Sequence, residues 1–143
     1  MVARGHTFSW KHLAIFASSG LLLFLPSCSG IFDVRPAGNI EQGVVFTFYK
    51  ADASQPSRFR ISNLVVQQQT RNGWKLIWAL DGAHSLRAIT YGATYPGLKE
   101  TGHAPKLVRG QLYRVAATSD GLYGGADFLI DRKGAVVIKP PTI

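Results

Sequence analysis

The 143-residue sequence predicts an all-β domain, an antiparallel β-sandwich of seven or eight strands that follows a short N-terminal leader. Apolar residues recur at every second position in short bursts, and turn residues such as Gly, Asn, Asp and Pro separate the bursts at intervals of roughly ten residues. No stretch keeps the period of an amphipathic helix. Short strands at this spacing are typical of antiparallel sandwiches and barrels.

The first 27 residues have the features of a secretory leader. Arg4 and Lys11 give a positively charged start, an apolar stretch covers residues 13–24, and small residues precede Cys28. A membrane-spanning helix needs about 20 mostly apolar residues, and this stretch is shorter and contains serines and a glycine. We therefore expect residues 1–27 to be a cleaved signal peptide.

Cys28 is the only cysteine, and it directly follows Leu25, Pro26 and Ser27. This run resembles the lipobox of bacterial lipoproteins, in which a leucine and a small residue frame a cysteine that becomes the first mature residue. The resemblance implies that Cys28 carries covalent lipid such as palmitate, which anchors the protein to a membrane, and that no other cofactor is needed. Ser29 stands where an aspartate would retain such a protein in the inner membrane, so the resemblance favours the outer membrane facing the periplasm.

Behind the cysteine, we expect residues 28–43 to be a tether with one edge strand at residues 31–34, and residues 44–140 to form the sandwich. Residues 44–49 predict the first strand of the sandwich because they are rich in β-branched and aromatic side chains. Residues 59–70 predict the next strand. This strand ends at Asn72-Gly73, a dipeptide that favours a two-residue hairpin turn.

After this hairpin, large apolar residues recur at every second position: Trp74, Leu76, Trp78 and Leu80. We expect these four side chains to share the core face of a central strand. Asp81-Gly82 then predicts a turn. The later parts of the chain follow the same pattern: strands at residues 86–91, 112–118, 126–130 and 135–138, a long irregular loop at residues 92–109, and a flexible hairpin loop at residues 121–125.

The run from Leu107 to Val115 resembles a turn and strand of fibronectin type III and related immunoglobulin-like sandwiches. The resemblance implies an immunoglobulin-like fold in which Tyr113 opens a late strand and its hydroxyl bonds back to upstream backbone, the tyrosine corner. An ordinary buried tyrosine on a strand is the alternative. An immunoglobulin domain with its own inter-sheet disulfide is excluded, because the chain has one cysteine.

The charge of the chain indicates the kind of partner. Without residues 1–27, the chain has 14 basic and 8 acidic residues. This balance favours anionic neighbours such as lipid headgroups, lipopolysaccharide phosphates or anionic glycans, and an exported protein is not expected to meet nucleic acid. Because the basic residues are dispersed along the sequence, a solvated basic surface is the alternative.

Tyr91, Tyr95 and Pro96 are the candidate binding residues. They lie at the start of the long loop, where tyrosine and proline present rigid contact area at a low entropic cost. The alternative is that the tyrosines fold back and cover the end of the sandwich.

Catalytic motifs are missing from the sequence. His84, Ser85 and His103 are the nearest approach to a catalytic or metal-binding set, and they form no known motif. We therefore expect no enzyme and no metal, but a non-catalytic binding module for an envelope protein or an anionic glycan. The alternatives are an accessory or assembly subunit of secretion, pilus or outer-membrane machinery and, third, a small hydrolase; the oligomeric state stays open.

Overall fold

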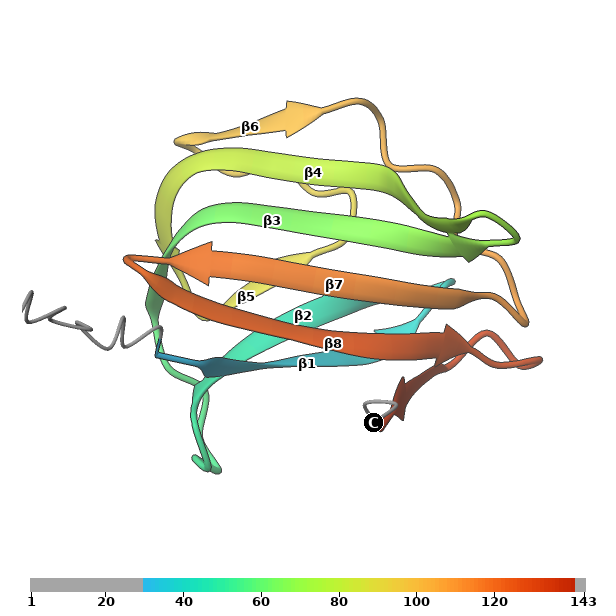
Figure 1. Cartoon of the computed structure of the whole chain (residues 1–143), viewed down its shortest axis with the longest axis horizontal. Coiled ribbons are helices and arrows are strands. Elements are labelled where there is room, and N and C mark those ends of the chain that lie inside the picture. The colour runs from blue at the N-terminus through green and yellow to red at the C-terminus, as the bar shows by residue number, and fades with distance from the viewer. Residues whose placement is uncertain (1–29, 141–143) are drawn as a thin grey trace, which may run out of the picture.

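The computed structural model describes residues 30–140, which form two antiparallel sheets of three and six strands (Figure 1). The three-stranded sheet has the order β1-β2-β5, and the six-stranded sheet has the order β6-β4-β3-β7-β8-β9. The strands are β1 (Phe32–Asn39), β2 (Gly43–Lys50), β3 (Phe59–Thr70), β4 (Gly73–Leu86), β5 (Ala88–Thr90), β6 (Leu98–Thr101), β7 (Leu112–Ser119), β8 (Leu122–Ile130) and β9 (Val136–Lys139). The predicted all-β sandwich is confirmed, with nine strands instead of seven or eight.

Among residues 30–140 there is no helix that is long and apolar enough to cross a membrane. The leader and Cys28 lie outside the described residues, so the signal peptide and the lipid anchor stay predictions.

The core forms between the facing sides of the two sheets, because alternate residues of each strand point inward. On β2 these are Val44, Phe46 and Phe48, and on β7 they begin with Tyr113 and Val115. Aromatic rings join the layers: the ring of Phe128 lies 5.7 Å from that of Phe46 and 5.5 Å from that of Tyr113. Without a disulfide in the described residues, this packing holds the sandwich together.

The two sheets meet along one side of the molecule, where β1 lies beside β8 (Figure 1). Isolated bridges link Ile31 to Tyr123 and Asn39 to Ala135. The expected tether of residues 28–43 therefore needs correction, since β1 and the turn into β2 belong to the sandwich. Gly124 allows the close approach, because a Cβ atom there would meet the Phe32 carbonyl oxygen at 2.5 Å.

A β-bulge divides β4 and overturns part of the predicted core face. Val66 pairs with Trp78, but the next residue, Gln67, pairs with Leu76, so Ile77 is an extra residue on β4. An extra residue reverses the faces of the side chains that precede it. Trp78 and Leu80 are buried as predicted, whereas Leu76 is 50% exposed and Trp74 is half-buried.

Three further expectations were wrong in detail. Asp81-Gly82 is not a turn, because β4 continues through it to Leu86. The irregular loop of residues 92–109 contains β6, which pairs with β4. Gly124 and Gly125 lie within β8 rather than in a hairpin loop. In each case, pairing with a neighbouring strand keeps the segment extended, although the glycines in it or beside it are typical of turns.

Candidate functional site

The sandwich has two ends of different character. At one end, which we call the tether end, the described chain starts: the Gly30 carbonyl accepts a hydrogen bond at 3.0 Å from the Tyr123 amide beside the β7–β8 turn. At the other end lie the turns at residues 40–42, 71–72 and 131–134 and the loop of residues 102–111 (Figure 1). The eight residues of β1 run from one end to the other, a length of about 26 Å at 3.3 Å per residue.

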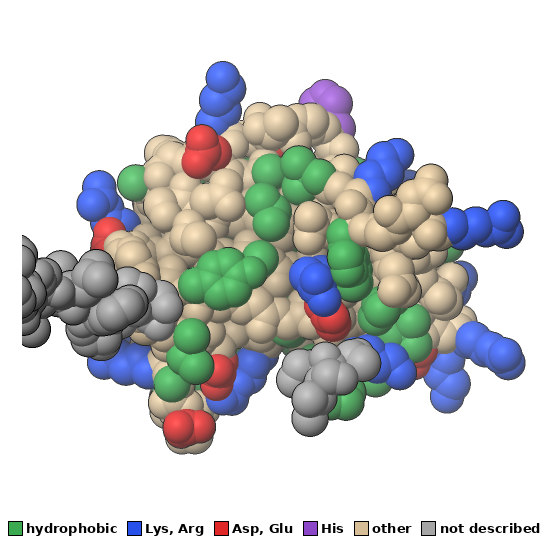
Figure 2. Space-filling view, in the orientation of Figure 1, with side chains coloured by type: hydrophobic (Ala, Val, Ile, Leu, Met, Phe, Trp, Pro, Cys, Tyr) green, Lys and Arg blue, Asp and Glu red, His purple; other side chains and the backbone are tan. Residues whose placement is uncertain are grey.

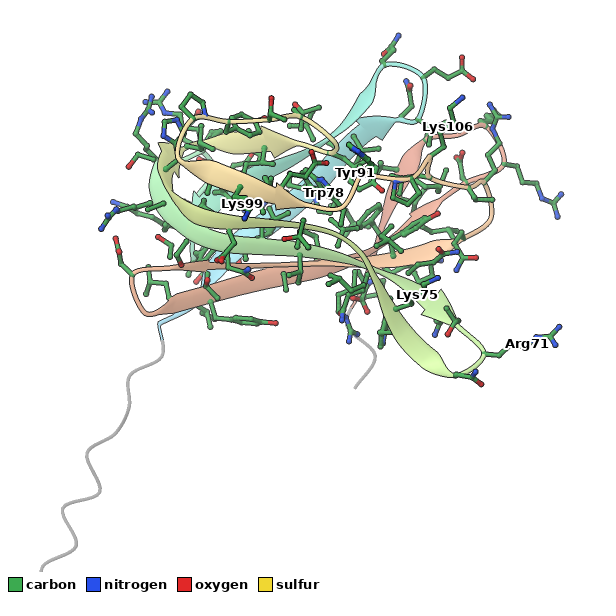
Figure 3. All side chains as sticks on the ribbon, turned by 90° about the horizontal axis from the view of Figure 1, so that it is seen from above. Arg71, Lys75, Trp78, Tyr91, Lys99 and Lys106 are labelled. Atoms are coloured by element: carbon green, nitrogen blue, oxygen red, sulfur yellow. The ribbon has the colours of Figure 1, made fainter. Side chains whose placement is uncertain are left out.

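Basic side chains gather at this second end, which we call the basic end (Figure 2). All of them are exposed: Arg71, Lys75, Lys106, Arg109, Arg132 and Lys133. Figure 3 shows Arg71 and Lys106 at this end on two separate segments, the β3–β4 hairpin and the loop before β7. Glu41 and Asp131 are the only acidic residues in the turns and loop that form this end. The end therefore has a net positive charge.

Few of these charges are neutralised within the described residues. Arg109 is the only one of the six with an ion pair there, at 3.0 Å from Glu41. The Asp131 carboxylate accepts backbone hydrogen bonds from Lys133 and Ala135, each at 2.8 Å, and so shapes its own turn. The remaining cations are available to an anion from outside.

A cleft of about 540 Å³ opens at the basic end, between the β1–β2 turn and the loop of residues 102–111. Apolar side chains form much of its lining: Ile40, Val44, Tyr91, Ala104, Pro105 and Leu107. Its charged side chains are Glu41, Lys106 and Arg109. The cleft thus combines an apolar lining with cations, an arrangement that suits a ligand with both apolar and anionic groups.

Tyr91 fixes one wall of this cleft. Its hydroxyl donates a hydrogen bond to the Pro105 carbonyl at 2.7 Å, and its ring contacts the ring of Trp78 edge-on at 5.1 Å (Figure 3). Burial raises the pKa of the Tyr91 hydroxyl well above its ordinary value, so the group is neutral and acts as a donor. The wall is therefore held to the core rather than left as a free loop.

The three predicted binding residues do not come together. Tyr91 lines the cleft, but the Tyr95 hydroxyl accepts a hydrogen bond at 2.8 Å from the Thr90 amide and so closes its own turn. Pro96 is exposed and does not line the cleft. The tyrosine hydroxyls are thus bonded to the backbone of the protein itself, as in the folded-back alternative.

Tyr113 makes the upstream contact that the sequence predicted. It is the second residue of β7, it is buried, and its hydroxyl accepts a hydrogen bond at 2.8 Å from the Val108 amide. The contact ties the loop of residues 102–111 to the core at a second point, three residues after the bond between Pro105 and Tyr91. The middle of this loop is therefore anchored on both sides of Lys106.

A second surface lies on the outer face of the six-stranded sheet. At its centre Arg114 forms two hydrogen bonds with Asp127, at 2.7 and 2.9 Å, and its guanidinium lies 4.1 Å from the ring centre of Trp74. We call the apolar residues on the neighbouring strands the outer-face patch: Trp74, Leu76, Leu112, Leu129 and Val137.

His84 and His103 are far apart. Thr101 on β6 pairs with Ala79 on β4. Ala79 lies five residues before His84, which corresponds to about 16 Å along the strand. From Thr101 the chain runs on to His103 in the direction away from His84. Ser85 follows His84 directly in the sequence. Within residues 30–140, no group of three or more His, Cys, Asp or Glu side chains could hold a metal ion.

Comparison of the chain with protein-family models, curated proteins and solved structures finds no match. The cleft therefore has to be interpreted from its own geometry. Sequence reasoning missed it because Glu41, Tyr91 and Arg109 come from distant segments that no motif links. The resemblance to immunoglobulin-like domains likewise stays a prediction.

Proposed function

We propose that this protein is a lipid-anchored lipoprotein of the cell envelope, and that its basic end binds an anionic envelope glycan without catalysing a reaction. The observation that supports this most is the grouping of five exposed cations without an ion pair in the described residues at the end opposite Gly30: Arg71, Lys75, Lys106, Arg132 and Lys133. Gly30 follows Cys28 by only two positions, so acyl chains on Cys28 would hold the tether end at the membrane. The basic end would then face away from that membrane.

The chemistry of the basic end suits such a ligand. Lys106 and the exposed Arg71 and Arg132 offer charged donors for phosphate or carboxylate groups, and guanidinium groups bind both in a two-pronged geometry. Tyr91 and the other apolar residues of the cleft offer a surface for the apolar faces of sugar rings. Because most of the cations are exposed, binding should weaken as the salt concentration rises.

A charge-reversal pair tests this proposal. The purified protein is incubated with lipopolysaccharide and, separately, with peptidoglycan sacculi, and the bound fraction is measured. We expect Lys106→Glu with Lys133→Glu to weaken binding to the preferred glycan by about tenfold or more, equivalent to about 1.4 kcal/mol.

The matched control is Lys50→Glu with Arg87→Glu, which makes the same change of charge at the tether end. This control should alter binding by less than about twofold, a difference under 0.5 kcal/mol. Equal losses in the two double variants would mean that net charge alone attracts the glycan, and would contradict a site at the basic end.

The anchor has a test of its own. Cys28→Ser should abolish incorporation of labelled fatty acid and release the protein from the membrane fraction, because the lipid would have no attachment point. Unchanged labelling and fractionation in this variant would contradict the lipid anchor.

The outer-face patch favours a second candidate, an accessory or assembly subunit of an envelope complex. Trp and Arg are enriched in protein interfaces, and here Arg114 stacks on Trp74 among apolar side chains. On this account, crosslinking in cells should yield one stoichiometric partner, which Leu76→Glu removes and Lys133→Glu retains. Loss of that partner from the Lys133→Glu protein alone would contradict docking at the patch.

A further inference from the structure

Two large apolar side chains are exposed at the tether end. Ile31 is 69% exposed and Tyr123 is 53% exposed, and Ile31 is the most exposed of the large hydrophobic residues that the structure describes. A backbone bridge joins the two residues, and the amide of Tyr123 bonds to the Gly30 carbonyl. The bridge therefore holds the two residues side by side, at the border of the outer face, where Tyr123 also lines a hollow with Arg114 and Asp127.

This pair is not part of the core. The facing sides of the sheets are filled by other residues, and Leu122, next to Tyr123, is the one that packs inward, so close to Gly30 that it occupies the space of a Cβ atom there. Single exposed hydrophobic residues are common on protein surfaces. The position of this pair is unusual because it adjoins the expected attachment point of the lipid.

The distance to that attachment point is short. Cys28 lies three residues before Ile31, so the chain between them spans at most about 11 Å. If acyl chains on Cys28 enter a bilayer, Ile31 and Tyr123 are brought to the level of the lipid headgroups. A longer tether would have left the sandwich free to turn in any direction.

We propose that Ile31 and Tyr123 are a second membrane contact, which enters the interface of the bilayer that holds the acyl chains of Cys28. The inference rests on the lipid anchor of the proposed function. Tyrosine suits this depth, since its ring prefers the boundary between headgroups and acyl chains while its hydroxyl stays hydrated. Asp120, in the adjacent turn, lies 4.0 Å from Arg60, so the contact brings no unbalanced negative charge to the lipid phosphates.

The contact would set the orientation of the protein. With the acyl chains and the Ile31–Tyr123 pair both at the membrane, the domain has two points of attachment at the tether end. The basic end, about 26 Å away along the strands, is then directed away from the membrane surface.

The single cysteine makes this testable in the acylated protein. Because the Cys28 thiol would be blocked by lipid, a cysteine introduced elsewhere is the only free thiol. Tyr123→Cys and, separately, Ile31→Cys are labelled with the environment-sensitive fluorophore NBD. The control is Val108→Cys, which replaces a side chain of similar exposure, 56%, at the basic end.

The labelled proteins are reconstituted into vesicles of phosphatidylethanolamine and phosphatidylglycerol, with and without doxyl-labelled lipid. We expect NBD at positions 31 and 123 to emit at shorter wavelength and at least about twice as brightly as NBD at position 108, and to be quenched by doxyl lipid. Identical spectra and no quenching at all three positions, in protein that is bound to the vesicles, would overturn the contact while leaving the anchor intact.

Failure of the anchor itself looks different. If Cys28 is not acylated, the unsubstituted protein takes up the label at its own thiol and does not stay on the vesicles. That outcome overturns the lipid anchor and, with it, this membrane contact.

Discussion

Trp74 and Trp78 lie four residues apart on the same strand, yet they have opposite environments. Trp78 is fully buried between the sheets, and its Nε1 donates a hydrogen bond at 2.7 Å to the Glu100 carboxylate on β6. Trp74 lies on the outer face beneath the guanidinium of Arg114. The bulge at Ile77 separates them, because residues that precede it on β4 have reversed faces.

One inserted residue thus gives the two parts of β4 different roles. The part of β4 that follows the bulge builds the core, while the part before it places an aromatic ring beside an ion pair on the surface. Without the extra residue, Trp74 and Trp78 would lie on the same face of β4. Both tryptophans would then be core residues, and the outer-face patch would lack its aromatic centre.

The largest expected effect separates the two tryptophans directly. Trp78→Ala should lower the free energy of unfolding by about 3–5 kcal/mol, because it leaves a cavity and removes the partner of Glu100. Trp74→Ala should lower it by less than about 1.5 kcal/mol, since that side chain is only half-buried. Urea unfolding followed by circular dichroism measures both, and equal losses would mean that the bulge does not divide the strand as described.

A smaller effect is expected on the outer face. Arg114→Ala removes the two hydrogen bonds to Asp127 and the stacking on Trp74, and we expect a loss of about 0.5–1.5 kcal/mol because the pair is partly solvated. The double variant with Trp74→Ala should lose less than the sum of the single losses, since the two side chains interact. Additive losses in this double-mutant cycle would show that the stacking contributes nothing.

An effect of similar size at neutral pH concerns Tyr91, the neighbour of Trp78. Tyr91→Phe should lower the free energy of unfolding by about 1 kcal/mol, through the lost bond to Pro105. In the wild type, the free energy of unfolding also falls at alkaline pH. Because burial raises the pKa of Tyr91, the folded state keeps this proton at pH values where the unfolded state has released it, so stability falls as the pH rises above about 10.

Chemical unfolding at a series of pH values measures this slope. The decline above pH 10 should be shallower in Tyr91→Phe than in the wild type, and part of it should remain because burial also raises the pKa of Tyr113. An unchanged slope would contradict a protonated, buried Tyr91.

The fold was more predictable than the site. Alternation in β2 and β7 and the hairpin turn at residues 71–72, beside Gly73, depend on neighbouring residues, so a single sequence reveals them. The bulge at Ile77 depends on the register of β3 against β4, and β6 forms only because β4 offers it an edge. Local patterns contain neither kind of information.

For the same reason the sequence identified Tyr91 but not its role. Its aromatic, amphipathic character was visible, but its contacts with Pro105 and Trp78 depend on how distant strands meet. Lys106, Arg109 and Glu41 looked like dispersed surface charges because their grouping exists only at the end of the folded sandwich.

The pairing of the first strand with late segments has a consequence for how the chain matures. β1 is completed on one side by β2, which follows at once, and on the other by β8 and the turn before β9, about ninety residues later. If the chain crosses a membrane from its N-terminus, β1 must wait with one side unpaired until nearly the whole chain has arrived, since contacts between distant segments form late. In that case we expect chaperones of the compartment that receives the chain to be needed most during that interval, and truncations that remove β8 and β9 to be degraded.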